Sequence, residues 1–300
     1  MACVMTAIGF LACETTLPGS KTRREDAFEH DNMISAIKPA FGARGWELRV
    51  IDWEAPMEAF AGLDLVMLGT SWNYQDKAQC FLAKLEELEA SGIKVCNSPD
   101  VVRWNITKTY LRELAERGAR TVPTLWRETV TSRGVSEAFD VFECDRVVVK
   151  RQVGAGAEGQ ELVARKSLPS SDWTFGAPAM LQPFLPAIAE KGELSFLFFG
   201  GEYSHCVRKL PKSGDYRIQS LYGGTESSHE PSADEASQAS AIIKALPFDA
   251  PLYARIDMLE GEDGQLMVME AELIEPYLYP EQGPDMGETL AKAVAKELGL

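Results

Sequence analysis

The sequence has no long hydrophobic run and no paired cysteine motif. Its apolar stretches stay well short of the ~20 residues that a membrane-spanning helix needs, so we expect no membrane span. Met1–Cys13 is apolar but has no basic residue before it, which favours a first buried strand over a signal peptide. The six cysteines form no C-x-x-C and have no histidine at metal-binding spacing. This pattern predicts reduced, mostly buried thiols in a cytoplasmic protein.

Positive charge is scarce. The 300 residues include 30 Lys and Arg against 45 Asp and Glu, which gives a formal net charge of −15. Such an acidic surface argues against nucleic acid or an anionic membrane as a partner. It also means that an anionic cofactor can bind only where basic residues or metal ions gather. The composition is otherwise that of a globular protein, with 45% hydrophobic residues, and the length suits two or three packed subdomains.

Several catalytic motifs are absent as well. We find no metalloprotease, nucleophile-elbow or kinase catalytic-loop pattern. Gly19–Thr22 resembles the end of a phosphate-binding P-loop, but Ser20 separates the glycine from the lysine and Glu14 stands where the first glycine is needed. The sequence therefore does not support a P-loop nucleotide site.

Strand and helix signals alternate over the N-terminal part of the chain. We expect strands at Cys3–Leu11, Glu47–Asp52, Leu63–Leu68 and Ile93–Cys96, and helices at Ala27–Arg44 and Lys77–Ser91. Alternating units of this kind predict a parallel sheet with helices on both faces. Because ligands bind at the carboxyl ends of parallel strands, Trp72, Asn73 and Tyr74 are candidate substrate contacts. Asp31 is a fourth candidate.

The pattern changes after residue 98, where a cap-and-turn cluster opens a helix and another follows at Thr107–Arg117. Strands and hairpins then dominate, with helices at Ala233–Leu246 and Glu288–Leu298. The expected strands are Val147–Lys150, Glu161–Ala164, Ala179–Phe184, Leu194–Phe199, His205–Leu210, Tyr253–Leu259 and Gln265–Glu272. Pro211–Pro231 is long, polar and rich in glycine, which is typical of a mobile lid.

A lysine at the end of a buried strand is the first chemical signal. Lys150 ends Val147–Lys150, where a charge needs a partner. The segment after it contains Gly154, Gly156 and Gly159, and such a segment can wrap phosphates with backbone N–H groups. These glycines match G-x-G-x-x-G, but a strand follows instead of a helix, so a hairpin loop over a nucleotide fits better than a Rossmann site. A plain glycine-rich hairpin remains the alternative.

Acidic residues on the last predicted hairpin are the second signal. Alternate residues of a strand share a face, so Arg255 and Asp257 point the same way, as do Glu270 and Glu272. The same rule puts Met269 on the opposite face. Three carboxylates on apolar strands repel one another unless cations neutralise them, and magnesium prefers such hard oxygen ligands. A solvated outer face of the hairpin remains the alternative.

Two weaker signals complete the pattern. The three cations are Lys108, Lys209 and Arg217. In an acidic protein, cations near a proposed phosphate site are stronger candidates for phosphate contacts. Gln182–Leu185 is a strand end that runs into a short linker, and Glu193 follows it. Backbone groups there can meet the edge of an adenine, and apolar side chains can cover its face.

Taken in order, these features resemble the ATP-grasp superfamily over residues 100 to 280, with a layout similar to glutathione synthetase and D-alanine–D-alanine ligase. The resemblance implies an α/β (α+β) fold with an N-terminal parallel-sheet domain (1–98), a central ATP-grasp subdomain with a glycine-rich lid (99–184) and a C-terminal subdomain with a metal site (185–300). The two α+β subdomains would clasp ATP between them.

The resemblance also implies a role for each candidate. Nucleotide contacts would come from Lys108, Lys150, the lid glycines Gly154, Gly156 and Gly159, the adenine-side residues Gln182, Phe184 and Leu185, and the ribose-side Glu193. The transferring phosphoryl group and the acceptor would meet Arg255, Lys209, Arg217, Gly223 and Gly224. Magnesium would be held by Asp257, Glu270 and Glu272.

One departure points to a subgroup. Many family members end the metal motif as Glu-x-Asn, whereas this chain has Glu270-Ala271-Glu272, in which the second glutamate can still bind magnesium. The strings Thr70–Tyr74, Val102–Asn105 and Glu272–Pro276 are similar to a bacterial branch that includes the cyclo-ligase closing O-ureido-serine to cycloserine. The branch implies antibiotic biosynthesis from an amino-acid derivative.

The expected function is therefore that of a carbon–nitrogen ligase. It would use ATP and two Mg²⁺ ions, with Mn²⁺ as a substitute, to activate a small-molecule carboxylate as an acyl phosphate for attack by an amine-type nucleophile, including one in the same molecule. The resemblance suggests a homodimer or larger assembly. Two alternatives remain: a small-molecule kinase that stops at phosphoryl transfer, and a non-catalytic ATP-binding sensor.

Overall fold

The computed structural model describes residues 5–154, 159–218 and 220–300. Within these ranges the chain forms four β-sheets. Residues 1–4 and 155–158 lie outside the described residues, and with them the start of the expected strand Cys3–Leu11 and the predicted lid residue Gly156. No described helix is long and apolar enough to cross a membrane.

The first sheet is parallel, in the order β2-β1-β3-β4. Its strands are β1 (Ala7–Ala12), β2 (Glu47–Asp52), β3 (Leu65–Thr70) and β4 (Lys94–Cys96), and its helices are α1 (Phe28–Ala43) and α2 (Ala78–Ala90). Alternate side chains of β1 face opposite ways, because Phe10 packs with α1 and Leu11 packs with α2. The prediction of a parallel sheet with helices on both faces is confirmed.

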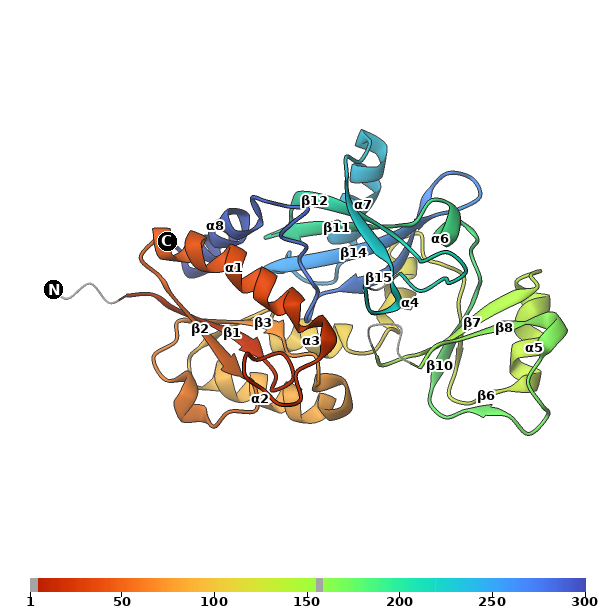
Figure 1. The fold of residues 1–300 in the computed structure, drawn as a ribbon, viewed down its shortest axis with the longest axis horizontal. Helices are drawn as coiled ribbons and strands as arrows, with labels where there is room; N and C mark the ends of the chain where they lie inside the picture. The colour runs from red at the N-terminus through yellow and green to blue at the C-terminus, as the bar shows by residue number, and fades with distance from the viewer. Residues whose placement is uncertain (1–4, 155–158, 219) are drawn as a thin grey trace.

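The C-terminal helix α8 (Met286–Leu298) folds back onto α1, and Figure 1 shows the two side by side. The contact is close at Gly287, where a Cβ atom would lie 2.1 Å from the carbonyl oxygen of Ala36. Only glycine fits there, so the two ends of the chain share one hydrophobic core.

The second sheet, β5-β10-β7-β8, forms the lobe at the right of Figure 1. Its strands are β5 (Leu125–Arg127), β7 (Arg146–Arg151), β8 (Glu161–Ala164) and β10 (Ala179–Pro183), accompanied by the pair β6 (Val130–Thr131) and β9 (Thr174–Phe175). Helix α5 (Ser132–Val141) covers one face, with Val135 and Phe139 in the core. The sequence analysis missed α5, although the Thr131 side chain caps it by accepting a bond from the N–H of Gly134.

The third sheet is antiparallel, in the order β13-β12-β11-β14-β15. Its strands are β11 (Glu193–Phe199), β12 (Glu202–Leu210), β13 (Thr225–His229), β14 (Tyr253–Glu260) and β15 (Leu266–Glu272). One face packs against α3 (Pro99–Asn105), α4 (Tyr110–Glu116) and α7 (Ala233–Ala245). Helices α3 and α4 therefore join the core of the third sheet, and the three-way division of the chain stays a prediction.

The predicted lid Pro211–Pro231 is partly regular structure. Its last part is β13, which pairs with β12, so the expectation of one mobile segment is wrong for these residues. The short turn η5 (Ser220–Tyr222) contacts η1 (Glu25–Ala27) beside the first sheet. The remaining short elements are η2 (Met57–Phe60), η3 (Tyr74–Lys77), η4 (Arg165–Ser167) and α6 (Ala187–Glu190).

We predict that Gly287→Ala destabilises the protein. The added methyl group collides with the backbone of α1, and overpacking of this kind costs about 1–3 kcal/mol. Gly42→Ala is the matched control, because Gly42 lies in α1 with open space around its Cα. Alanine there gains helix propensity of up to about 1 kcal/mol. Urea unfolding should show a lower midpoint for the first variant only; equal midpoints would contradict the close contact.

Candidate active site

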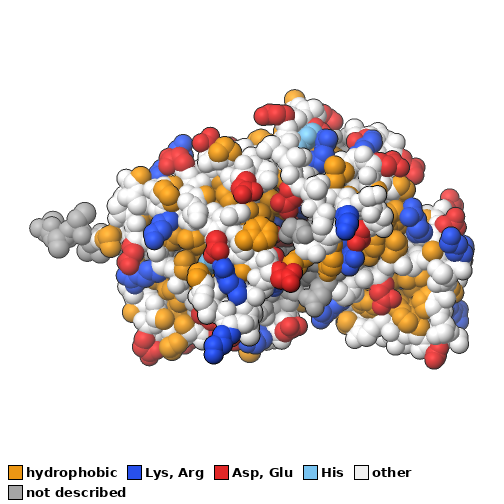
Figure 2. Space-filling model, viewed as in Figure 1, with side chains coloured by type: hydrophobic (Ala, Val, Ile, Leu, Met, Phe, Trp, Pro, Cys, Tyr) orange, Lys and Arg blue, Asp and Glu red, His pale blue; other side chains and the backbone are white. Residues whose placement is uncertain are grey.

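A cavity of about 630 Å³ lies where the three main sheets meet. Figure 2 shows the surface notched between the lobe of the second sheet and the rest of the molecule. The cavity wall includes most of the residues expected from the sequence, namely Trp72, Lys108, Lys150, Gly154, Gln182, Phe184, Leu185, Glu193, Lys209, Arg217, Arg255, Asp257, Glu270 and Glu272. Folding thus brings together side chains from 72 to 272 in the sequence.

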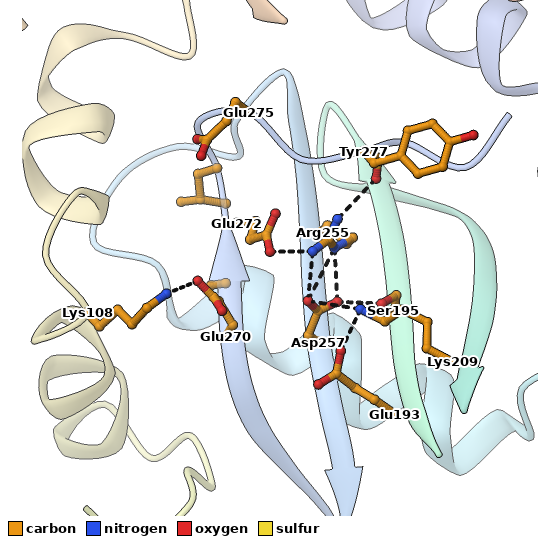
Figure 3. A network of polar contacts seen from close by, with 12 residues as sticks. Lys108, Glu193, Ser195, Lys209, Arg255, Asp257, Glu270, Glu272, Glu275 and Tyr277 are labelled. Atoms are coloured by element: carbon orange, nitrogen blue, oxygen red, sulfur yellow. Dashed lines mark hydrogen bonds and ion pairs between the residues drawn. The ribbon is translucent and has the colours of Figure 1, made fainter. Parts of the chain in front are cut away.

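Arg255 is at the centre of the charged network in Figure 3. Its guanidinium donates to both carboxylate oxygens of Asp257, with Nε–Oδ1 and Nη2–Oδ2 both 3.0 Å, and also to Glu272. Nη1 donates to the carbonyl oxygen of Tyr277 at 3.3 Å. Burial by itself lowers the pKa of Arg255, but the charges of Asp257 and Glu272 outweigh it and raise the pKa. The arginine therefore stays charged at the cavity wall.

Lys209 forms a second buried ion-pair group beside it. Its Nζ lies 2.5 Å from Glu193 Oε1 and 3.3 Å from Asp257 Oδ2. Ser195 Oγ donates to Asp257 Oδ1 at 2.5 Å. Burial opposes the charge on Lys209, but the carboxylates of Asp257 and Glu193 raise its pKa overall. Asp257 thus receives bonds from three side chains and is oriented before any ligand arrives.

A β-bulge decides which way the two glutamates of β15 point. In β15 Leu266 and Val268 face the apolar core, so a regular strand would send Glu270 and Glu272 there too. The pairing with β14 shifts by one residue between Asp257 and Met258, where Met269 is the extra residue. Beyond the bulge Ala271 faces the core, and both glutamates face the cavity. Met269 also lines the cavity, so the expectation that it faces away is wrong.

Carboxyl groups outnumber the cations that pair with them at this end of the cavity. Five carboxyl groups line it, those of Glu193, Asp257, Glu270, Glu272 and Glu275. Their basic partners are Lys108 on Glu270, Lys209 and Arg255. Burial, and then the charges of Glu272 and Glu270, raise the pKa of Glu275 to about 8. The site therefore has the hard oxygen donors that suit a divalent cation.

Those oxygens are engaged by cations in this arrangement. Lys108 bonds to Glu270, and Arg255 bonds to both Asp257 and Glu272. Among the described residues, no three acidic, histidine or cysteine side chains form a ready-made metal cluster. Metal binding would therefore exchange some of these ion pairs for metal–oxygen bonds.

The other end of the cavity is apolar. Phe184 and Leu185 pack with Ile188 and Leu259, and the guanidinium of Arg146 lies 3.9 Å from the Phe184 ring centroid. Gln182 donates from Nε2 to Thr124 Oγ1 at 2.9 Å, while its buried Oε1 has no partner among the described residues. A flat heterocycle with an amino group would fit this end.

Lys150 also lines the cavity. It lies opposite Met180 in the pairing of β7 with β10. Burial lowers the pKa of Lys150, and the charge of Lys108 lowers it further, while Glu270 opposes both. An anionic ligand between the two lysines would relieve their repulsion. Arg217 lies at another part of the wall, paired with Asp215 at 2.7 Å.

Six of the expected residues are not in the cavity wall, as far as the described residues show: Asp31, Asn73, Tyr74, Gly159, Gly223 and Gly224. Asp31 pairs with Arg23 at 2.7 Å, and Asn73 accepts a bond from Trp53 at 2.6 Å. Tyr74 is buried against Phe81. Its hydroxyl nevertheless bonds to Glu275, so it reaches the site through a neighbour.

Sequence reasoning also missed several residues of the wall, among them Arg24, Asp26, Glu29, Gln75, Asp76, Glu226 and Glu275. Arg24 donates to both oxygens of Asp26 at 2.6 and 2.7 Å, and its guanidinium lies 5.1 Å from the Trp72 ring centroid. Arg24 and Asp26 come after the carboxyl end of β1 in the sequence. Ligands bind at the carboxyl ends of parallel strands, and this rule, which pointed to Trp72, could also have found them.

Comparison with known proteins agrees with this architecture. Residues 8–97 match the family model described as D-cycloserine synthetase DcsG, N-terminal domain. The cycloserine biosynthesis protein DcsG of Streptomyces lavendulae is 28% identical over 274 residues, covering 85% of this chain and 90% of the relative. A glutathione synthetase of Prochlorococcus marinus (strain MIT 9313) is 28% identical over 186 residues, covering 59% of this chain and 57% of the relative.

Solved structures share the whole fold. The crystal structure of D-cycloserine synthetase DcsG has a TM-score of 0.78 at 23% identity, covering 97% of this chain and 99% of the other. The D-alanine–D-alanine ligase of Bacillus anthracis complexed with ATP has a TM-score of 0.67 at 15% identity, covering 98% and 97%. The ATP-grasp ligase PsnB complexed with its minimal precursor has a TM-score of 0.65 at 18% identity, covering 97% and 99%. The chain is thus similar in sequence to a cycloserine biosynthesis protein, and it has the fold of the ATP-grasp ligases.

Proposed function

We propose that the protein activates a substrate carboxylate with ATP and magnesium, forming an acyl phosphate that an amine-type nucleophile then attacks. The observation that carries this proposal is that one cavity is lined by apolar side chains, by two lysines and by the Arg255–Asp257 network. A nucleotide needs these features for its base, its phosphates and its reacting group.

The nucleotide would lie along the second and third sheets. Adenine would occupy the slot at Phe184 and Leu185, beside Gln182. Lys108 and Lys150 would hold the phosphates. Glu193 would meet the ribose, as the family resemblance implies. Gly154 lines the cavity beside Lys150 and would bring backbone N–H groups to the phosphates.

Asp257, Glu270 and Glu272 would hold magnesium. The three carboxyl groups on adjacent strands at this end of the cavity support the assignment, because magnesium prefers such hard oxygen ligands. Magnesium, when bound, supplies charge neutralisation for the phosphate oxygens. Lys108 would then be released from Glu270 and become free to bind phosphate.

Arg255 and Lys209 would stabilise the transferring phosphoryl group. The guanidinium offers a planar fork of donors, and burial in a poorly solvated site strengthens each bond. The two side chains are already oriented by Asp257 and Glu193, so little reorganisation is needed. Arg217 would approach from the segment that touches η1, where closure would keep water from the acyl phosphate.

The substrate would enter from the side of the first sheet, where Arg24, Trp72 and Glu275 line the cavity. An amino-acid derivative fits there, because both cationic and anionic side chains face it. Proteins of the same fold include ligases that act on such small molecules, as the names D-alanine–D-alanine ligase and D-cycloserine synthetase indicate.

The direct test is magnesium-dependent ADP release with amino acids and ureido- or hydroxamate-type acids, alone and in pairs, with products identified by mass spectrometry. A joined or cyclised product together with ADP and phosphate supports the proposal. A stable phosphorylated product without joining would identify a kinase instead, and magnesium–ATP binding without turnover of any substrate would favour a sensor.

Asp257→Asn should lower turnover by about 100-fold or more, because it removes a charge that orients Arg255 and Lys209 at the reacting group. The variant should keep the far-ultraviolet circular dichroism of the parent. Asp263→Asn is the matched control, since Asp263 lies in the turn of the same hairpin and pairs with Arg120 in solvent. Parental turnover in Asp257→Asn would overturn the site assignment.

Lys150→Ala should raise the apparent Michaelis constant for ATP about 10- to 100-fold. A lost hydrogen bond to a charged group costs about 1.5–3 kcal/mol, which corresponds to this change. Lys166→Ala removes an exposed lysine from the same lobe and should leave the constant unchanged. Initial rates over a range of ATP concentrations measure both. If the two variants bind ATP alike, Lys150 has no role at the phosphates.

A further inference from the structure

β15 carries two of the proposed metal ligands, yet it is the edge strand of the third sheet. Its first half is covered by backbone, because Val268 N–H donates to Arg120 O at 2.8 Å and Val122 N–H donates to Val268 O at 3.3 Å. Its second half, where Glu270 and Glu272 lie, is bound by side chains from α3 and α4 instead.

Asn105 binds the peptide groups on both sides of Glu272. Its Nδ2 donates to the carbonyl oxygen of Ala271 at 2.8 Å, and its Oδ1 accepts from the N–H of Leu273 at 3.0 Å. The side-chain amide thus makes the two bonds that a neighbouring strand would make. Asn105 is only 8% exposed, so water does not replace these bonds readily.

Tyr110 binds the next peptide toward the bulge. Its hydroxyl accepts from the N–H of Ala271 at 2.9 Å, which is the peptide group that follows Glu270. The ring is 3% exposed and lies 5.0 Å from the Trp104 ring, centroid to centroid. Lys108, from the same short segment, pairs with the Glu270 side chain. Three residues of the segment 105–110 therefore hold both the backbone and a carboxylate of β15.

These bonds matter because of the bulge at Met269. A shift of one residue in a strand exchanges its two faces, so without the bulge Glu270 and Glu272 would face the apolar core and Ala271 the cavity. Asn105 and Tyr110 bind backbone groups directly after the bulge, and those groups are available to them only in the bulged register. We propose that Asn105 and Tyr110 are positioning residues that hold Glu270 and Glu272 toward the metal, an inference that depends on the proposed metal role of these glutamates.

Tyr110→Phe is the first test, because it removes one hydroxyl and keeps the ring packing. The N–H of Ala271 loses its acceptor, and β15 is free to shift near Glu270. We expect binding of Mn²⁺ in the presence of ADP, measured by electron paramagnetic resonance, to weaken about tenfold or more, as is typical when a residue that orients a metal ligand is lost. ADP binding without metal should not change.

Thr16→Val is the matched control, because the buried Thr16 hydroxyl also accepts a backbone N–H, that of Cys13, but lies beside the first sheet. It should lower the unfolding temperature without changing Mn²⁺ binding. Asn105→Ala should weaken Mn²⁺ binding further than Tyr110→Phe; if it does not fold, Tyr110→Phe decides alone.

Glu270→Gln distinguishes a failure of the positioning role from a failure of the proposed metal site. If Glu270→Gln weakens Mn²⁺ binding and Tyr110→Phe does not, the positioning role is wrong while the metal site stands. If Glu270→Gln binds Mn²⁺ like the parent protein, the proposed metal site itself fails, and the positioning role with it.

Discussion

The fold places several carboxyl groups close together in a cavity that is shielded from water. Asp257, Glu270 and Glu272 lie on two adjacent strands at one end of a buried cavity, where their mutual repulsion would oppose folding if nothing compensated it. Arg255, Lys209 and Lys108 reduce that repulsion. Burial, and then the charges of Glu272 and Glu270, raise the pKa of Glu275 to about 8, which favours the neutral form of this carboxyl group.

This constraint explains how the three sheets are used. The third sheet carries the acidic network, the second sheet brings Lys150 and the apolar slot, and the first sheet closes the remaining side with Arg24 and Trp72. Helices α3 and α4 link them, because they pack on the third sheet while Lys108 reaches into the cavity. The cavity is thereby lined by groups from all three sheets, an arrangement that suits the proposed nucleotide site.

The similarity to solved ATP-grasp ligases concerns the fold and not the substrate. The solved relatives share the architecture at 23% identity or less, so they define the frame and leave the substrate to the local side chains. The family model covers 8–97, the part that we propose supplies the substrate side. Arg24, Asp26 and Glu275 lie on that side, and they are therefore the residues in which a difference in substrate should first be sought.

The sequence by itself determined the features that depend on neighbours along the chain. Strands such as Glu47–Asp52 and Glu161–Ala164 follow from local composition, and Arg255 and Asp257 share a face because a regular strand repeats every two residues. Only the tertiary structure decided the direction of Glu270 and Glu272, because the bulge arises from pairing with β14 and is held by Asn105, over 160 residues away. Contacts between such distant segments leave no period in the sequence. For that reason the candidate residues could be named from the chain, while the geometry that brings them together could not.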